Sequence, residues 1–456
     1  MKRKIYDQLL AWKHKSNGKV ALMLDGARRV GKSWIAEEFA KHEYEDYLLI
    51  DFSKVKPKVK KFFEEYLDDL DTFFMYLFAE YHKNLPRGRS LIIFDEVQKF
   101  PRAREAIKHL VADGRYHYLE TGSLISINKN VKDIVIPSEE RRIPMYPMDF
   151  EEFLWALGDE ATMPLVRKRF AEGLAIGDDT NDTIMNRFRQ YMVVGGMPQA
   201  VSEFAATHDL GAVDEIKRDI LALYRADIFK YGGAAKHKIL ALFNAIPSEL
   251  SKHEKKFVLA DVSAKARMRE YESAFEWLKS AMTVNIAYAA SEPNVGFNLN
   301  SDRDSLKCYL GDTGLLISMA FDENALLAED IHNRILTERI EINEGMLVEN
   351  AVAQMIRASG HELYFYSNSA RKDSADRMEI DFLIDKPTLT RRHNVSPIEV
   401  KSGSNYTFNS LNKFIAKYRN MISRPYLLHT KDFKEDNGVT FLPLYMAPLL
   451  VSFTDS

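Results

Sequence analysis

The chain has 456 residues, more than one hydrophobic core usually supports, so two to four domains are expected. Its 46% hydrophobic and 28% charged residues exclude a disordered or fibrous protein, and a formal net charge of −3 excludes a globally basic nucleic-acid binder, while local basic patches stay compatible with the composition. A single cysteine, Cys308, excludes a disulfide framework, and no run of about 18 apolar residues predicts a membrane span, so we expect a cytoplasmic protein without a membrane partner.

The first motif follows a strand predicted over residues 19–25 and precedes a helix predicted over residues 33–40. It fits the phosphate-binding pattern G-x-x-x-x-G-K-S. In this pattern backbone N–H groups close around the phosphates, the lysine reaches the β- and γ-phosphates, and the serine hydroxyl sits on Mg²⁺. The predicted ATP-binding residues are Gly26, Ala27, Arg28, Arg29, Val30, Gly31, Lys32 and Ser33.

A second strand is predicted over residues 45–52 and two helices over residues 56–83, followed by an unbroken apolar strand over residues 90–96 that ends in two carboxylates. A fully apolar run is typical of a central parallel strand, and ligands bind at the carboxyl ends of such strands. Asp95 would hold Mg²⁺ together with Ser33, and Glu96 would polarise the attacking water. The acidic pair favours hydrolysis over transfer of the phosphoryl group to another substrate, with Lys32 and Glu96 as the catalytic residues.

The next predicted strand, residues 116–120, ends in Thr121, Gly122 and Ser123. A hydroxyl at this position would sense the γ-phosphate or orient the water, or it would cap a helix. Farther on, Arg142 would contact a phosphate in its own subunit or in a neighbour, or would form an ion pair with the glutamates at 139 and 140.

At this point the chain resembles the prokaryotic AAA-type ATPases that carry a C-terminal domain of unknown function. The segments that carry the resemblance are residues 26–33, 94–99, 120–123, 147–153, 191–201, 224–228 and 307–316. The resemblance implies an α/β P-loop NTPase core with a parallel sheet, ATP and Mg²⁺ as cofactors, and a family in which self-association occurs.

The region between the core and the C-terminal part is predicted to be mainly helical. Helices with short loops over residues 150–232 would form a lid on the nucleotide. Helices near 237–246 and 266–282, followed by a hairpin over residues 283–299, have the outline of a winged helix. Such a module either reads DNA, with Lys265, Arg267 and Arg269 at its candidate recognition helix, or packs domains together.

The C-terminal part carries a second set of charged residues. Glu349 lies on a predicted amphipathic helix, and residues 379–384 and 397–401 alternate polar and apolar residues as half-buried strands do. Period-two geometry puts Glu399 and Lys401 on one face, and pairing of the strands would bring Asp381 opposite that face.

This order of residues resembles the PD-(D/E)xK nuclease superfamily. The resemblance implies that Asp381 and Glu399 are metal ligands, that Glu349 is an outer or additional ligand, and that Lys401 activates the water. The alternative is a nuclease-like fold with an Asp381–Lys401 cross-strand pair and no catalysis. Residues 391–393, Arg-Arg-His, would contact a phosphate backbone or form a solvated turn.

Together these patterns predict four domains. They are a P-loop ATPase core (1–147), a helical lid (148–232), a winged-helix-like segment (233–301) and an α/β nuclease-like domain (302–456). The predicted function is ATP hydrolysis whose nucleotide state controls a C-terminal domain that cleaves or binds DNA or RNA. The alternative is a nucleotide-dependent switch that recruits a protein or nucleic acid without cleaving it.

Overall fold

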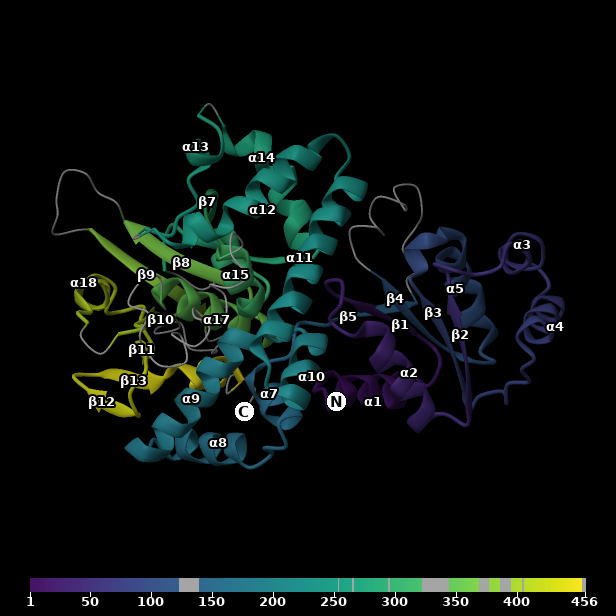
Figure 1. Ribbon diagram of the computed structural model, residues 1–456, viewed down its shortest axis with the longest axis horizontal. Coiled ribbons are helices and arrows are strands. Elements are labelled where there is room, and N and C mark those ends of the chain that lie inside the picture. Colours follow the sequence, from purple (N-terminus) through teal and green to yellow (C-terminus); the bar gives the residue numbers. More distant parts are fainter. Residues whose placement is uncertain are drawn as a thin grey trace. The chain divides into compact units, whose positions relative to one another are not determined.

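The computed structural model describes residues 1–122, 139–252, 254–264, 266–293, 296–321, 344–368, 377–385, 395–403 and 406–452. The chain forms two compact units (Figure 1). The first unit comprises Met1–Tyr146 with Ser280–Met282, and the second comprises Pro147–Lys279 with Thr283–Ser456. None of the described helices is both long and apolar enough to cross a bilayer.

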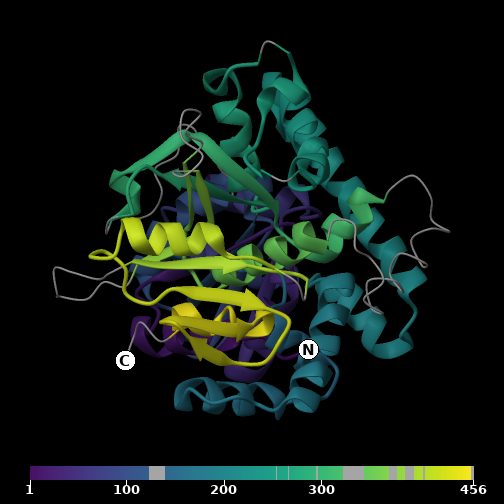
Figure 2. The same ribbon diagram turned by 90° about the vertical axis from the view of Figure 1, so that its left-hand side faces the viewer.

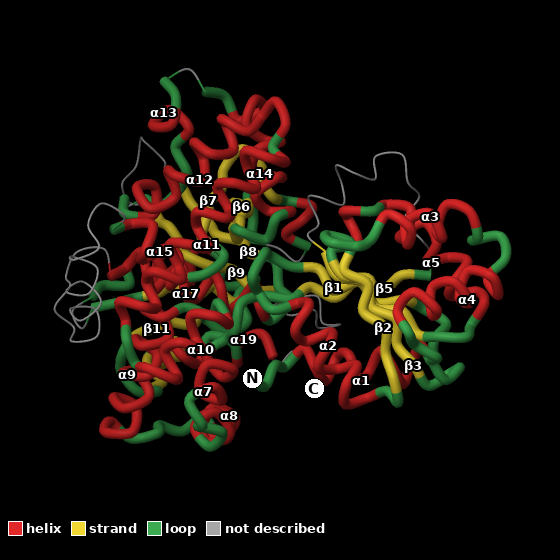
Figure 3. Tube along the Cα trace, turned by 45° about the vertical axis from the view of Figure 1, so that its right-hand side comes forward, coloured by secondary structure: helices red, strands yellow, loops and turns green. Residues whose placement is uncertain are grey.

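The first unit is built on a parallel five-stranded sheet in the order β2-β3-β4-β1-β5. Figure 3 shows its strands in yellow among red helices. The strands are β1 (Ala21–Asp25), β2 (Asp46–Asp51), β3 (Ser90–Asp95), β4 (His117–Gly122) and β5 (Glu140–Pro144). The helices are α1 (Ile5–Ser16), α2 (Lys32–Glu43), α3 (Pro57–Glu65), α4 (Leu70–Tyr81) and α5 (Pro101–Asp113), with a short 3-10 turn η1 (Val97–Lys99).

The strand order explains where the polar residues meet. β1 and β3 are buried along their whole length, as their apolar sequences predicted for central strands. Because all five strands are parallel, their carboxyl ends lie along one edge of the sheet, and β4 lies between β1 and β3. The tip of β4 is therefore placed between the phosphate-binding loop after β1 and the acidic end of β3.

The aromatic residues of α4 pack into the core of this unit. Phe73, Phe74 and Leu77 are buried with Phe63 and Phe94. Their helical spacing thus produces a packed face, as expected for an amphipathic helix against a sheet.

The second unit combines a helical block with a mixed eight-stranded sheet in the order β12-β13-β11-β10-β9-β8-β6-β7. Figure 2 shows the C-terminal strands of this sheet in yellow. The strands are β6 (Val284–Ala290), β7 (Ser301–Leu310), β8 (Leu363–Asn368), β9 (Met378–Asp385), β10 (Val395–Val400), β11 (Tyr426–His429), β12 (Lys434–Asp436) and β13 (Val439–Pro443).

The helical block of the second unit begins shortly after the end of the first unit at Tyr146. The block contains α7 (Phe150–Ala156), α8 (Thr162–Glu172), α9 (Asp178–Val194), α10 (Pro198–Thr207), α11 (Leu210–Tyr231), α12 (Lys236–Leu250), α13 (Leu259–Val262), α14 (Met268–Ser280), α15 (Thr313–Ala320), α17 (Glu344–Ala358), α18 (Asn409–Lys417) and α19 (Leu449–Ser452). Short 3-10 turns are η2 (Gly233–Ala235), η3 (Phe297–Leu299) and η4 (Leu444–Met446). The α17 helix contacts β6, β7, β8 and β10, and α18 contacts β9.

The hairpin predicted as the wing of a winged helix has a different role. β6 and β7 do pair with each other, but β6 also pairs in parallel with β8, so both strands belong to the eight-stranded sheet. The boundary predicted between residues 301 and 302 therefore falls at the start of β7, whose partner β6 lies before it. The physical reason is burial, because β6 and residues 305–310 of β7 are almost entirely inaccessible and need neighbours beyond a two-stranded hairpin.

Candidate functional site

Two glycines permit the backbone conformation of the loop between β1 and α2. Gly31 has φ +96° at the N-cap of α2, a left-handed conformation that favours glycine. A Cβ on Gly26 would lie 2.4 Å from the carbonyl oxygen of Met145, so only glycine fits there. The loop is braced from outside its own sequence, because the Arg3 guanidinium donates to the carbonyl oxygens of Val30 at 3.0 Å and of Tyr146 at 2.7 Å.

Lys32 lies inside this loop. Its Nζ donates to the carbonyl oxygens of Gly26 at 2.9 Å and Ala27 at 2.8 Å. Burial lowers the pKa of Lys32, and the carboxylates of Glu96, Asp25 and Asp95 oppose that shift. Among the described side chains, none caps the first amides of α2. Free N–H groups at a helix N-terminus next to an ammonium group form a site for an anion.

The remaining members of the loop differ in exposure. Arg28 and Arg29 are exposed to solvent, whereas Ala27 and Val30 are buried. Arg29 has φ +72°, uncommon for a residue with a side chain. The loop therefore presents backbone groups and Lys32 inward, with its two arginines at the surface.

Ser33 and Asp95 are brought together although 62 residues separate them. The Ser33 hydroxyl donates to Asp95 Oδ1 at 2.7 Å. Thr121 Oγ1, at the tip of β4, donates to the same carboxylate oxygen. A hydroxyl and a carboxylate in contact at the start of α2 are oxygen donors of the kind that Mg²⁺ prefers, so these residues fit the ion that a P-loop implies.

Glu96 follows β3 in a left-handed conformation, with φ +53°. Its backbone N–H donates to Thr121 Oγ1 at 3.3 Å, and Gln98 Nε2 donates to its Oε2 at 2.6 Å. The Glu96 carboxylate is therefore held by Gln98, two residues farther along the chain. A non-glycine residue at positive φ directly after the acidic strand is the type of strain that occurs at functional sites.

Arg142 forms an ion pair. Its Nε donates to Glu140 Oε1 at 2.9 Å, and the guanidinium of Arg104 contacts the same carboxylate at 2.9 Å. The Glu140 side chain is fully buried, so the pair is more enclosed than the surface pair considered from the sequence. Of the two alternatives for Arg142, phosphate contact and an ion pair with a neighbouring glutamate, the described contacts correspond to the second.

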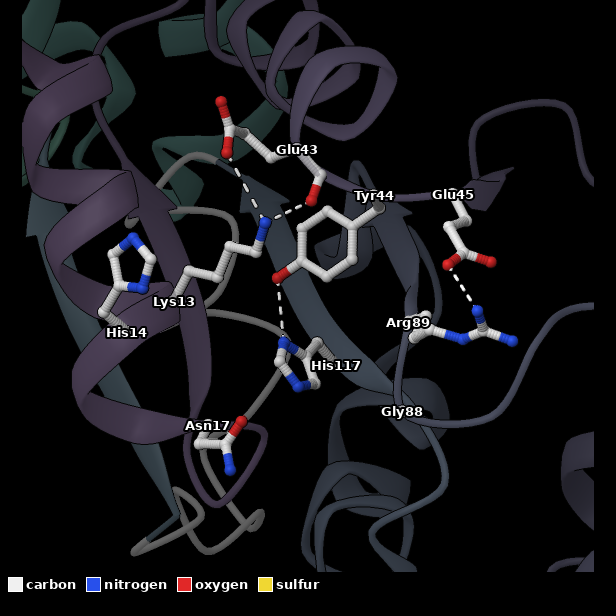
Figure 4. A pocket seen from close by; sticks show the side chains of 9 residues that line it. All are labelled: Lys13, His14, Asn17, Glu43, Tyr44, Glu45, Gly88, Arg89 and His117. Atoms are coloured by element: carbon white, nitrogen blue, oxygen red, sulfur yellow. Dashed lines mark hydrogen bonds and ion pairs between the residues drawn. The ribbon is translucent and has the colours of Figure 1, made fainter.

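The opposite end of this sheet holds a pocket of about 310 Å³ (Figure 4). Its cationic residues already have acidic partners. Lys13 lies 3.4 Å from Glu43 Oε2, and Arg89 lies 2.6 Å from Glu45 Oε1. This pocket is lined by Lys13, His14, Asn17, Glu43, Tyr44, Glu45, Gly88, Arg89 and His117, at the amino ends of the strands.

The second unit brings the predicted C-terminal residues onto neighbouring elements. β9 and β10 are antiparallel, and their register ends with Ile398 opposite Phe382, next to Glu399 and Asp381. Asp381 Oδ2 accepts from the Val400 N–H at 2.9 Å, and Lys401 Nζ lies 2.6 Å from Glu399 Oε1. Residues 391–393 lie outside the described residues, as do Ser123 and Lys265.

Lys307, to which the sequence patterns assigned no role, lies among the carboxylates. Its side chain on β7 is fully buried, and its Nζ lies 2.7 Å from Glu379 Oε1, 3.2 Å from Glu349 Oε1 and 3.5 Å from Asp381 Oδ1. Lys255 and the hydroxyl of Tyr309 also contact Glu349. We call Lys255, Lys307, Glu349, Glu379 and Asp381 the lysine–carboxylate cluster.

The Lys307 ammonium opposes a divalent metal ion at the centre of this cluster. A doubly charged ion about 4 Å from the Lys307 ammonium would be repelled by about 8 kcal/mol at an effective dielectric constant of about 20. Within the described part of the chain, no group of three or more His, Cys, Asp or Glu side chains is placed to hold a metal ion. Of the predicted metal ligands, Asp381 and Glu349 thus lie beside the Lys307 ammonium, whereas Glu399 contacts Lys401 outside this cluster, and its metal role stays a prediction.

The pKa values in the cluster follow from burial and charge. Burial raises the pKa of Asp381 to about 7, and the charge of Glu349 adds to the shift. Burial would also raise the pKa of Glu349, but Lys255 and Lys307 outweigh it and lower this pKa to about 2. The neighbouring carboxylates raise the pKa of Lys307 against the effect of burial, so this lysine stays charged.

Several residues at these sites were not assigned from the sequence. Gln98 and Lys307 lie in segments that carry the family resemblance, but nothing in their local pattern gives them a partner. Glu379 is two residues from Asp381, and the same period-two rule that was applied to Glu399 and Lys401 would have placed it on the face of Asp381. Arg3 has no local signal, since its contact with Val30 spans 27 residues.

Three protein families match parts of the chain. Residues 18–154 match an AAA domain, residues 185–325 match a domain of unknown function (DUF8612), and residues 344–446 match another domain of unknown function (DUF4143). The first match confirms the predicted AAA-type core in the first unit. The C-terminal match is to a domain of unknown function and not to a nuclease family, so the resemblance to nucleases stays a prediction. None of the curated proteins matches the chain.

Matches among solved structures are of low similarity. PCH-2 of C. elegans matches with 12% identity and a TM-score of 0.26, covering 44% of this chain and 60% of that chain. The RuvB Holliday junction branch migration motor of Thermotoga maritima matches with 13% identity and a TM-score of 0.27, covering 62% and 89%. The Aeropyrum pernix ORC1 protein in complex with DNA matches with 12% identity and a TM-score of 0.25, covering 72% and 94%.

Proposed function

We propose that the first unit binds ATP with Mg²⁺ and hydrolyses it. The observation that carries this proposal is the contact of Ser33 with Asp95 at 2.7 Å, directly beside Lys32 at the start of α2. When phosphate binds, the Lys32 ammonium would donate to phosphate oxygens in place of the carbonyl oxygens of Gly26 and Ala27. The AAA-domain match over residues 18–154 supports the same assignment.

In this proposal each residue has a distinct task. The backbone of residues 26–31 and the ammonium of Lys32 bind the phosphates. Ser33 and Asp95 hold Mg²⁺, which neutralises phosphate charge. Glu96 orients a water molecule and accepts its proton, and Gln98 keeps the Glu96 carboxylate in place through their 2.6 Å hydrogen bond.

The test separates binding from hydrolysis. Lys32→Ala should weaken ATP binding by about 100-fold, because a charged group that contacts phosphate is lost. Glu96→Gln should bind ATP like the parent but turn it over about 100-fold to 10,000-fold more slowly, the usual range for a lost general base. Glu37→Gln, at a half-exposed position of α2 where the carboxylate pairs with Lys41, is the matched control and should change neither quantity.

Two results would contradict the assignment. Parental turnover in Glu96→Gln would remove that residue from the reaction. Absence of saturable ATP binding by the parent protein in the presence of Mg²⁺ would remove the site altogether.

We propose further that the nucleotide state controls the second unit, and that this unit binds a nucleic acid or protein partner without cutting it. The specific observation in favour is Lys307, whose ammonium lies 3.2 Å from Glu349 and 3.5 Å from Asp381, two of the carboxylates that the nuclease resemblance would assign to a metal. The competing function is Mg²⁺-dependent cleavage of DNA or RNA by Asp381, Glu399 and Lys401.

A cleavage assay distinguishes these two functions. Plasmid DNA and single-stranded RNA should remain intact with Mg²⁺ or Mn²⁺, with and without ATP, while ATP turnover proceeds. Binding of a labelled oligonucleotide, read by fluorescence anisotropy, should differ between the ATP-bound Glu96→Gln variant and the nucleotide-free protein. Nicking that disappears in both Asp381→Ala and Lys401→Ala would establish the competing function instead.

A further inference from the structure

We infer that the Lys307 ammonium takes the place of a divalent metal ion in the lysine–carboxylate cluster, so that the second unit holds its acidic residues together without metal. The inference deepens the proposed non-cleaving role of the second unit. It does not depend on ATP hydrolysis by the first unit.

The position of the ammonium is the first step. Lys307 Nζ lies within 3.5 Å of carboxylate oxygens from three different side chains, Glu349 on α17 and Glu379 and Asp381 on β9. A central cation surrounded by carboxylates from a helix and a strand balances their charge as an oxygen-ligated metal ion would.

The charge balance is the second step. Lys307 and Lys255 both contact Glu349, and together they supply two positive charges, as many as one divalent ion. Lys255 and Lys307 therefore offset as much of the negative charge of the three carboxylates as one divalent ion would. Buried carboxylates without such compensation would be strongly destabilising.

The rigidity of the arrangement is the third step. Lys307 is fully buried, and its Nζ also lies 5.2 Å from the centre of the Phe365 ring. Residues on both sides of it, Leu306 and Cys308, are buried on β7, which pairs with β6. The ammonium is consequently fixed by the sheet and cannot swing to solvent without opening the core.

Removal of the lysine should create the metal site that it fills. The full-length protein is used in an Asp95→Asn background without nucleotide, so that the first unit does not contribute, and Mn²⁺ binding is followed by electron paramagnetic resonance. The background protein should bind no Mn²⁺ that depends on Asp381. Lys307→Met should bind one Mn²⁺ with a dissociation constant at least tenfold below the highest Mn²⁺ concentration at which the background protein shows no such binding. Lys307→Met with Asp381→Asn should lose that binding.

The matched control is Lys401→Met, which removes a lysine that contacts Glu399 outside the lysine–carboxylate cluster and leaves Lys307 in place. It should not create a site. If Lys307→Met does not fold, Mn²⁺ added during refolding should restore its folded state, because the divalent ion would replace the missing charge.

The inference is overturned by any of three results. These are Asp381-dependent Mn²⁺ binding before Lys307 is replaced, a folded Lys307→Met that gains no Mn²⁺ binding, and an unfolded Lys307→Met that Mn²⁺ does not restore. The ATP-binding test with Lys32→Ala is read separately, so failure of the metal inference and failure of the ATPase proposal are distinguishable.

Discussion

One hydroxyl links the two acidic residues at the end of β3. Thr121 Oγ1 donates to Asp95 Oδ1 and accepts from the backbone N–H of Glu96 at 3.3 Å. Thr121 is fully buried at the tip of β4, between the strands that carry the loop and the acidic pair. The roles considered from the sequence, γ-phosphate sensing or water orientation and helix capping, stay predictions, and the described contacts position Asp95 and Glu96.

Thr121→Val tests this positioning role. The substitution keeps the shape but removes the hydroxyl, so Asp95 loses a donor and the Glu96 N–H loses its acceptor. We expect kcat for ATP hydrolysis to fall about tenfold, which corresponds to about 1.4 kcal/mol, while ATP affinity changes less. Steady-state turnover and equilibrium ATP binding are the two measurements. Thr121→Ser should retain most of the activity, and a Val variant with parental kcat would argue against the role.

His429 gives the second unit a defined sensitivity to acid. The side chain is buried on β11, with Nδ1 2.8 Å from the Tyr406 hydroxyl, and burial lowers its pKa to about 4. An unfolded histidine has a pKa near 6.5, so between about pH 6.5 and pH 4 the unfolded state binds more protons than the folded state. The free energy of unfolding therefore decreases as the pH falls through this window.

The expected size follows from the pKa difference. Between pH 7 and pH 5 the parent should lose about 2 kcal/mol of unfolding free energy relative to His429→Gln, which cannot be protonated there. Urea unfolding of both proteins at pH 7, 6 and 5 measures this difference. An identical pH dependence of the two proteins would show that His429 is not buried as a neutral group.

At the scale of elements, the second unit depends on a close approach of two backbones. The start of α15 lies against the end of α9, and a Cβ on Gly314 would lie 2.6 Å from backbone atoms of Gly195. Asp312 secures the contact, because its carboxylate accepts from the Gly196 N–H at 2.6 Å and the Leu315 N–H at 2.9 Å. Helix α15 is therefore fixed by backbone contacts and a cap rather than by side-chain packing alone.

Gly314→Ala should consequently destabilise the second unit. The added methyl group meets backbone that cannot rotate away, so we expect a loss of about 3 kcal/mol in unfolding free energy, as for overpacked cores. Chemical denaturation followed by circular dichroism provides the measurement. Gly403→Ala, at a position with nothing within 4 Å of the added Cβ, is the matched control and should be nearly neutral. Equal stability of the two variants would contradict the close approach.

At the scale of the whole molecule, the chain consists of two compact units with separate sheets. The proposed ATP site lies entirely within Met1–Tyr146, and the lysine–carboxylate cluster lies entirely within the second unit. A ligand that binds only one folded unit stabilises that unit by mass action.

Calorimetry of the parent protein should therefore resolve two unfolding transitions. ATP with Mg²⁺ at about 100 times its dissociation constant should stabilise one of them by about 2.7 kcal/mol and leave the other in place. In Lys32→Ala the nucleotide should shift neither transition. A single transition that moves as a whole with ATP would show that the two units unfold together.

The sequence by itself determined those parts of the protein whose chemistry depends on residues that are adjacent in the chain. The glycines, Lys32 and Ser33 stand in one loop, and an apolar strand followed by Asp95 and Glu96 indicates a buried parallel strand with its acidic end at the ligand edge. The alternation around Asp381 and Glu399 likewise predicted two strands, β9 and β10, which the structure pairs.

Only the tertiary structure decided which distant residues meet. Strand order brought Ser33 and Thr121 to the same oxygen of Asp95, and the pairing of β6 with β8 turned a predicted wing into part of a large sheet. Burial of Lys307 on β7 beside α17 and β9 put an ammonium where a metal was expected. The physical reason is that local periodicity fixes the face on which a side chain lies, whereas its partners are fixed by the order and register of strands that are far apart in the chain.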